Sequence, residues 1–409
     1  MRYTLTRRDF GKGAAAAGAL LAGTGRLGPA RAATRPIKLG SLLPRSGYEA
    51  LIGQSCQRGV DLAKRMLPEM GYAIEVIDAD TESKPEVART QAEKLIREGA
   101  EMLVGAFDSG QTFAIAQVAE QNGIPFVINI GSDPAITEQG YKYIFRNFPT
   151  SVMLGSHGLA RFNDLFAATG AAPKTAVLMI VNDTFGQTML KGINALMPKV
   201  NLPFQIVETI SYDPQSKDLS IEVAKAKAAG AELHMVVTRL NDAILMVREM
   251  VKQKYEPMGI ISPGSPGMYQ TQFMKVLGKY ADYAVTNIPW LDPKQPFSRT
   301  FEAEFTKANP DEICTLDAGF TFEGFLIAGD AYKRAGSTKP EALVEALKAT
   351  NIKDRVMIGG PITFDEKGQN VNLPSGVVQI RSGKPTVVLP AENAEMTPVF
   401  PMPGWSKRA

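Results

Sequence analysis

The sequence predicts an α/β fold of two similar lobes, each holding a parallel sheet with helices on both faces. From residue 35 onward, short apolar runs alternate with longer segments whose apolar residues recur at helical spacing, which is typical of a parallel sheet. The alternation starts again after Pro149 and gives a second series of about the same size. The length of 409 residues fits two or three folding units.

The first series alternates expected strands with expected helices. The strands are expected at residues 37–43, 74–77, 102–104 and 125–130, and the helices at 54–70, 85–97 and 112–121. Pro85 favours a helix start at its position, because the N–H that proline lacks would have no partner in the first turn.

The second series has the same rhythm and ends in a more helical region. Its strands are expected at residues 177–181, 204–210, 234–237 and 259–262, and its helices at 186–197, 219–229 and 243–253. After Pro289, helices are expected at 297–307, 320–335 and 340–349, followed by short strands near 377–380 and 386–389. Short elements at the end of the chain indicate that it crosses back between the lobes.

The N-terminus has the pattern of a twin-arginine export signal. Residues 7–12 match that signal at all positions but Gly11, where leucine is usual, and the pair Arg7 and Arg8 is its defining feature. A weakly apolar stretch follows at residues 14–25, which is too short and too rich in glycine to span a bilayer well.

A cleavage site and the charge balance agree with export. Alanines at positions 30 and 32 have the spacing that suits a signal peptidase, so we predict a signal peptide at residues 1–32 and a periplasmic mature chain. The whole chain has a formal charge of +3, and residues 1–32 contribute six basic residues and one acidic residue, which leaves about −2 on the rest. A nearly neutral mature chain has no electrostatic attraction to nucleic acid or to an anionic membrane.

The cysteine and histidine content disfavours a metal site. The chain has two cysteines, Cys56 and Cys314, and two histidines, which makes a Cys/His site improbable. In an oxidising compartment the two cysteines have two alternatives, a disulfide or two separate semi-buried thiols, and we expect the second. We predict no metal and no cofactor.

Several short motifs occur in an order and at a spacing that are specific together. They are Ile37–Gly40 leading to Leu43–Gly47, the acidic strand end Asp78–Thr81, Gly105–Ser109 before a helix, Gly123–Val127, and Asn182–Gln187 in the second series. Over nearly all of residues 35–390 the chain resembles the type I periplasmic binding proteins of the Leu/Ile/Val-binding class.

The resemblance implies a fold, a function and partners. It implies two doubly wound, Rossmann-like lobes joined by a hinge of three crossovers, with a ligand held between them. The implied boundaries are residues 33–150 and 288–361 for lobe 1, residues 151–287 and 362–392 for lobe 2, and residues 393–409 for a C-terminal tail. The implied role is that of a monomeric, non-enzymatic solute-binding component that delivers a small carboxylate ligand to the permease and ATPase subunits of an ABC importer.

The expected ligand contacts on lobe 1 follow the strands. Ser109 and Gly110 open a helix directly after a strand, where free N–H groups and the helix dipole attract a carboxylate. Ser109 matches the family serine that binds the ligand carboxylate, and its alternative role is that of a helix N-cap. The loop at residues 129–133 is one residue shorter than in the family, so Ser132 and Asp133 are both candidates.

The expected contacts on lobe 2 depart from the amino-acid-binding members. The stretch 262–267 has no acidic residue for a ligand ammonium group, and Arg239 lies near the position of a family tyrosine. Arginine suits a carboxylate through its two-pronged fork, although a solvated surface charge is the alternative for Arg239. Apolar walls are expected from Ile52, Phe107 and Phe185. We therefore expect an organic acid more than a branched-chain or other hydrophobic amino acid.

Other function classes have less support in the sequence. No nucleophile elbow, dinucleotide-binding loop or phosphate-binding loop is present, so an exported enzyme would lack a recognisable nucleophile, base or cofactor site. A ligand sensor of the same fold that signals to another protein is the alternative to a transport component.

Overall fold

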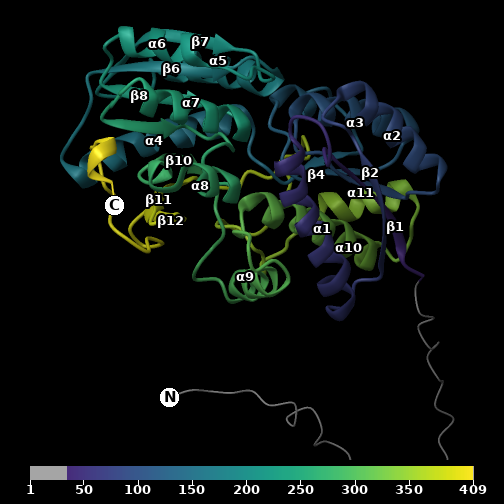
Figure 1. The fold of residues 1–409 in the computed structure, drawn as a ribbon. Helices are drawn as coiled ribbons and strands as arrows, with labels where there is room; N and C mark the ends of the chain where they lie inside the picture. The colour runs from purple at the N-terminus through teal and green to yellow at the C-terminus, as the bar shows by residue number, and fades with distance from the viewer. Residues whose placement is uncertain (1–34, 409) are drawn as a thin grey trace, which may run out of the picture. The chain divides into compact units, whose positions relative to one another are not determined.

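Two β-sheets organise the chain, and each forms the centre of one lobe (Figure 1). The structure is a computed structural model that describes residues 35–408. The predicted signal peptide at residues 1–32, with Arg7 and Arg8, lies outside the described residues.

The first sheet is entirely parallel. Its strands are β1 (Ile37–Leu43), β2 (Ile74–Asp80), β3 (Met102–Gly105), β4 (Phe126–Ile128) and β5 (Ile144–Arg146), in the order β2-β1-β3-β4-β5. Its helices are α1 (Ala50–Glu69), α2 (Pro85–Arg97), α3 (Ser109–Asn122), α9 (Pro296–Ala308), α10 (Leu316–Ala335) and α11 (Pro340–Lys348). Because β1, β3 and β4 lie side by side, their carboxyl ends meet at one edge, where open parallel sheets bind ligands.

The second sheet is mixed. Its strands are β6 (Thr175–Val181), β7 (Gln205–Tyr212), β8 (Leu233–Val237), β9 (Gly259–Ser262), β10 (Val285–Ile288), β11 (Gly376–Arg381) and β12 (Lys384–Leu389), in the order β12-β11-β10-β9-β8-β6-β7. Its helices are α4 (Ser151–Thr169), α5 (Thr184–Leu196), α6 (Ser220–Ala228), α7 (Leu240–Lys252) and α8 (Thr271–Leu277). The last two strands pair antiparallel and extend the parallel β6–β10 core.

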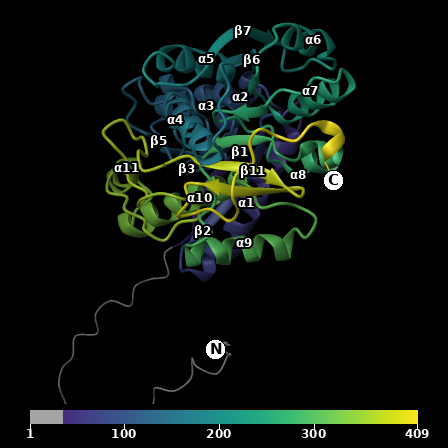
Figure 2. The same cartoon turned by 90° about the vertical axis from the view of Figure 1, so that its left-hand side faces the viewer.

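The chain passes between the lobes three times. It enters lobe 2 between β5 and α4, returns to lobe 1 between β10 and α9, and enters lobe 2 again before β11. Figures 1 and 2 show the result for lobe 1, where the late helix α10 lies beside the early helix α1. The predicted two-lobed, doubly wound fold with three crossovers is confirmed.

The third crossover lies later than the sequence predicted. Lobe 1 was expected to end at residue 361, but Gln369 still forms a parallel β-bridge with Arg146 of β5. The Phe364 ring packs edge-on against Phe145 at 5.3 Å, and Asn370 Nδ2 donates to Asn147 Oδ1 at 2.9 Å. These contacts keep residues 362–370 on lobe 1, because the edge strand β5 offers them backbone partners.

A buried acid fixes the crossover segments to α10. Glu323 is 0% exposed and accepts two hydrogen bonds from Arg355, at 3.1 and 2.8 Å. It also accepts from Asn147 Nδ2 at 2.7 Å and from the N–H groups of Val356 and Met357, each at 2.9 Å. A buried charge is tolerated only when it is paired and hydrogen-bonded, and here its partners come from two separate crossover regions.

The C-terminal segment is part of lobe 2. Phe400 and Trp405 are buried, and Phe400 packs on Phe166 of α4 with ring centroids 5.1 Å apart. Met402 N–H donates to the Met258 carbonyl at 2.7 Å, and Trp405 Nε1 donates to the Tyr255 carbonyl at 2.9 Å. Residues 393–408, expected as a tail, are therefore a packed element.

Cys56 and Cys314 are separate, buried free thiols, as expected. Among residues 35–408, no helix has both the length and the apolar character needed to cross a bilayer.

Candidate functional site

The carboxyl ends of strands from both lobes surround one small cavity. From lobe 1, the segments that follow β3 and β4 contribute Phe107, Ser109, Ile130 and Ser132. From lobe 2, the segments that follow β6, β8 and β9 contribute Phe185, Arg239, Gly264 and Pro266. The wall is completed by Phe148, Leu154, Tyr269, Ile288 and Leu316. We call this the interlobe cavity.

The interlobe cavity is mostly apolar and small. Its volume is about 20 Å³, which is room for about one water molecule. Arg239 is the one charged residue among the lining residues, and Ser109 and Ser132 supply hydroxyl groups. An organic ligand can enter only if the lobes move apart or the lining side chains rearrange.

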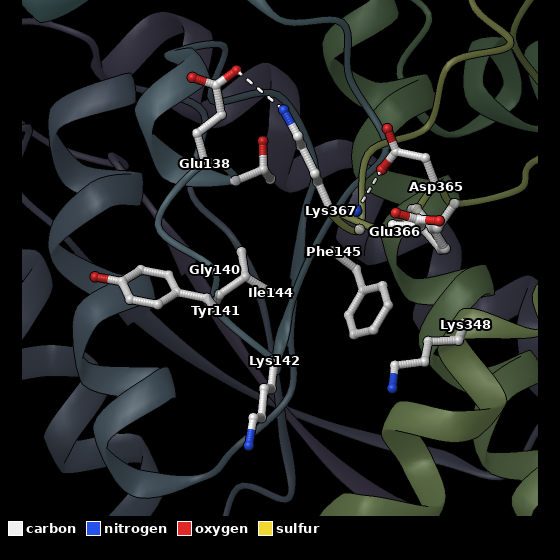
Figure 3. Close-up of a pocket in the computed structure, with 13 residues that line it drawn as sticks. Glu138, Gly140, Tyr141, Lys142, Ile144, Phe145, Lys348, Asp365, Glu366 and Lys367 are labelled. Atoms are coloured by element: carbon white, nitrogen blue, oxygen red, sulfur yellow. Dashed lines mark hydrogen bonds and ion pairs between the residues drawn. The ribbon is translucent and has the colours of Figure 1, made fainter.

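A larger groove lies elsewhere, along the β5 edge of the first sheet (Figure 3). Its volume is about 600 Å³, and its wall carries charges of both signs. Lys367 Nζ lies 3.7 Å from Glu138 Oε1, and the Lys367 N–H donates to Asp365 Oδ1 at 2.9 Å. The groove runs beside an edge strand and away from the strand ends where parallel sheets hold ligands, so the interlobe cavity is the better candidate.

Arg239 connects the two lobes through carboxylates. It precedes α7 in lobe 2, and its Nε donates to Asp183 Oδ2 of the same lobe at 2.9 Å. Its Nη2 donates to Asp108 Oδ2 of lobe 1 at 2.7 Å and lies 3.6 Å from Glu49 Oε1 of lobe 1. We call Glu49, Asp108, Asp183 and Arg239 the interlobe ion cluster.

The interlobe ion cluster is almost fully withdrawn from solvent. The side chains of Arg239, Asp108 and Asp183 are 7%, 7% and 10% exposed, and that of Glu49 is 0% exposed. Burial, followed by the charge of Asp108, raises the pKa of Glu49 well above its usual value, and burial also raises the pKa of Asp108. Although burial opposes its charge, the neighbouring carboxylates raise the pKa of Arg239. The guanidinium of Arg239 therefore stays charged, next to two acids, Glu49 and Asp108, whose charged forms burial disfavours.

Two aromatic rings, one from each lobe, cover the guanidinium. The Arg239 Cζ lies 5.4 Å from the centroid of the Phe107 ring and 4.8 Å from that of Phe185, within cation–π range. Phe107 has φ of +80°, an uncommon value for a bulky residue. Its N–H donates to Asn129 Oδ1 at 3.0 Å, and Asn129 Nδ2 donates to Thr321 Oγ1 at 2.9 Å, so neighbouring groups hold this conformation.

The start of α3 is occupied by the chain's own carboxylate. The N-cap is Asp108, whose Oδ1 accepts from the N–H groups of Gly110 at 2.8 Å and Gln111 at 3.1 Å. Ser109 is therefore not the N-cap, which removes its alternative role. Ser109 lines the cavity, whereas Gly110 does not and lies near Thr184.

The other predicted contacts divide into two groups. Phe107, Phe185 and Ser132 line the interlobe cavity, as Arg239 does. Asp133 instead caps the short helix η1 (Pro134–Ile136), with Oδ1 2.9 Å from the Ala135 N–H, and Ile52 is buried in the core around α1. Neither Asp133 nor Ile52 is among the residues that line the cavity.

Sequence reasoning missed the three acids around Arg239. Asp108 and Asp183 are the N-caps of α3 and α5, and an aspartate before a helix can be recognised in the sequence. That pattern indicates a helix cap, but it does not indicate a partner on the other side of the cleft. Glu49 has no side-chain cap hydrogen bond at the start of α1, and its Oε2 accepts from Gln111 Nε2 at 2.7 Å. Nothing local in the sequence points to that contact.

Comparison with known proteins agrees with the geometry. A family model described as "Periplasmic binding protein" matches residues 36–385, most of the chain. The chain belongs to this family. It is a type I periplasmic binding protein.

Individual relatives of this periplasmic binding protein are distant but cover most of its length. The Leu/Ile/Val-binding protein homolog 8 of Brucella abortus is 25% identical in an alignment 392 residues long, which covers 89% of this chain and 92% of that one. Two solved structures share the fold. LivJ of Streptococcus pneumoniae, in complex with isoleucine, has a TM-score of 0.73 at 18% identity and covers 86% of this chain and 98% of its own. A solute-binding protein of Rhodopseudomonas palustris, in complex with benzoate, has a TM-score of 0.74 at 19% identity and covers 88% and 99%.

Proposed function

We propose that this periplasmic binding protein is the solute-binding component of an ABC importer and works as a monomer. It binds a small, largely apolar organic ligand between its lobes and delivers it unchanged to the permease. The observation that carries this proposal is the interlobe cavity, where strand ends of both lobes place phenylalanine rings and serine hydroxyls around one point.

Similar proteins support the kind of ligand. Those with solved structures include complexes with isoleucine, leucine, benzoate and 3,4-dihydroxybenzoic acid, each a small molecule with an apolar body. The phenylalanine-lined cavity suits such a body, since burial of apolar surface is the main source of affinity in pockets of this kind. We propose that Ser109 and Ser132 contact its polar end and that Phe107, Phe185 and Arg239 form its walls.

The expectation of a carboxylate ligand had two physical supports. One was a free Arg239, and the other was an open helix N-terminus at Ser109 and Gly110. In the structure Asp108 takes the N–H groups at the start of α3, and three carboxylates surround Arg239. Neither feature now favours a carboxylate over another polar group.

Transport is tested by recovering the ligand and following its uptake. Native mass spectrometry of the protein purified from periplasm should show a bound small molecule of unchanged mass. A strain without the gene should take up this molecule more slowly, and the wild-type gene should restore uptake. Chemical conversion of the molecule by the purified protein, or unchanged uptake in the deletion strain, would contradict the proposal.

We also propose export by the twin-arginine route, from the sequence of residues 7–12. Replacing Arg7 and Arg8 together with lysine should leave the precursor in the cytoplasm. Normal periplasmic yield of that variant would exclude this route while leaving the ligand-binding proposal intact.

A further inference from the structure

The positive charge of Arg239 in the interlobe ion cluster is compensated before any ligand enters. Arg239 donates to Asp183 and Asp108 at 2.9 and 2.7 Å and lies 3.6 Å from Glu49. One cation therefore faces three acids. No unmatched positive charge remains at the cavity wall, because Arg239 is the one charged residue among those that line it.

This arrangement disfavours a ligand carboxylate. A carboxylate in the cavity would meet a guanidinium that is already neutralised by acids outside the cavity lining, and like charges in a water-poor site repel strongly. A helix N-terminus is the other common binding site for a carboxylate. At the start of α3, however, the N–H groups of Gly110 and Gln111 already donate to Asp108 Oδ1.

The same arrangement disfavours a protonated amine. Among the lining residues its one charged neighbour would be Arg239 itself, while the three acids do not line the cavity and pair with the guanidinium. The lining carries no carboxylate that could pair with an ammonium group. Pairing is what makes a buried charge tolerable.

A neutral polar group meets suitable partners. The hydroxyls of Ser109 and Ser132 can donate or accept. Within residues 35–408, no hydrogen bond is seen from the Nη1 nitrogen of Arg239, in contrast to Nε and Nη2. Nη1 is therefore the nitrogen left to donate to a ligand oxygen.

We infer that the interlobe cavity selects a ligand with an uncharged polar head, such as a carboxamide, ketone or alcohol, on an apolar body. Asp108 is the selectivity-determining residue, because its carboxylate holds both the α3 N-terminus and Arg239. This inference rests on the proposed ligand-binding function and specifies the ligand class of the same site.

Matched sets of probes test the head group alone. Benzoate, benzamide and benzylamine form one set, and 4-methylpentanoate, 4-methylpentanamide and 4-methylpentylamine form another. By calorimetry at pH 7, the amide should bind at least about tenfold more tightly than the acid and the amine, given the cost of an unpaired or like charge in such a site. A carboxylate or amine that binds most tightly overturns the inference and leaves the binding protein intact.

The Asp108→Asn variant tests the determinant. Asparagine keeps an oxygen for the α3 cap but removes one negative charge from Arg239. The variant should gain at least about tenfold in affinity for the acids relative to the amides. Asp218→Asn is the control, because Asp218 is an exposed acid that accepts from Ser220 N–H at 2.8 Å before α6, outside the interlobe ion cluster. Unchanged selectivity in Asp108→Asn overturns the role of Asp108.

Absence of binding in both probe sets also overturns the inference as stated. The proposed function would still be tested separately, because recovery of the bound molecule from periplasm and its uptake are measured without these probes.

Discussion

At the scale of single residues, Ser109 illustrates how a helix cap on the preceding residue leaves a small polar side chain free at a cavity wall. Asp108 caps α3 in its place, and Ser109 is 2% exposed at the wall of the interlobe cavity. Within residues 35–408, no hydrogen bond of the Ser109 hydroxyl is seen. The start of α3 is therefore capped without this hydroxyl, which leaves it available for the ligand contact that we propose.

Ser109→Ala should therefore weaken binding without weakening the fold. A lost hydrogen bond to a buried polar group costs about 1–3 kcal/mol, which is about a tenfold to hundredfold loss of affinity for the ligand recovered from periplasm. The unfolding midpoint of the free protein should stay the same, and Ser216→Ala, at a half-buried serine outside the cavity, is the control for affinity. An unchanged affinity would remove Ser109 from the site.

Asp317 is a second residue that allows a prediction, because its burial makes the stability of the protein depend on pH. It lies in the first turn of α10, and its Oδ2 accepts from Gln270 Nε2 of lobe 2 at 2.6 Å and from Thr315 Oγ1 at 2.8 Å. Burial raises its pKa from 3.8 to about 6. The native state therefore retains this proton up to a higher pH than the unfolded chain does.

The sign of the resulting pH dependence is fixed by linkage. Between about pH 4 and 6 the native state binds more protons at Asp317 than the unfolded state, so its contribution to stability falls as the pH rises through this window. The loss is roughly 3 kcal/mol at most, from a shift of about two pKa units. Stability of Asp317→Asn, measured by urea unfolding from pH 4 to 6.5, should fall less steeply than that of the wild type. Parallel curves would contradict the raised pKa.

At the scale of elements, α1 and α10 pack closely enough to exclude one methyl group. A methyl group on Gly59 of α1 would lie 2.3 Å from the backbone carbonyl oxygen of Ala318 in α10. A backbone atom cannot turn away as the end of a flexible side chain can. Because α10 also carries Leu316 of the cavity wall and Asp317, the close packing positions part of the site.

Gly59→Ala should destabilise lobe 1 in spite of its higher helix propensity. Overpacking costs about 1–3 kcal/mol, whereas alanine in a helix interior is favoured over glycine by about 1 kcal/mol. Gly192→Ala in α5 is the matched control, since the nearest atom to its added methyl is 3.6 Å away. Urea unfolding should show a lower midpoint for Gly59→Ala and an equal or higher one for Gly192→Ala. Equal gains in both variants would show that the α1–α10 contact has room.

At the scale of the whole molecule, the interlobe ion cluster links the lobes in the described conformation. Arg239 and Asp183 belong to lobe 2, whereas Asp108 and Glu49 belong to lobe 1. Domains joined by thin crossovers are expected to move relative to one another, and a ligand that contacts both lobes favours their closed state. The lobes described here already meet across the cavity through the chain's own charges.

Removal of the central cation should therefore open the molecule. Arg239→Met leaves three acids facing one another, and loss of one partner of a buried ion pair costs about 3–5 kcal/mol. Small-angle scattering without added ligand should give a larger radius of gyration than for the wild type. Arg65→Met is the control, because Arg65 pairs with Glu304 on the surface of lobe 1 at 2.8 Å. An unchanged radius for Arg239→Met would show that other contacts hold the lobes together.

The sequence by itself determined the class of fold and the family. Alternating apolar runs and helical periods require covered parallel sheets, and α2 and β9 have the predicted bounds because Pro85 and a short apolar run mark them locally. Elements with weak local signals, such as β5 and α4, were not predicted from the sequence. The edge strand β5 has three residues, and α4 contains Gly155 and Gly158, which weaken a helical pattern.

Only the tertiary structure decided what the cleft contains. The sequence marked Arg239, Ser109 and Phe185 as cleft residues, and all three line the cavity. It could not show that Arg239 is already paired, because Asp183 and Asp108 lie 56 and 131 positions away along the chain. Contacts between the two lobes depend on how the two sheets are positioned relative to each other in the folded chain. A local pattern of residues does not predict that arrangement.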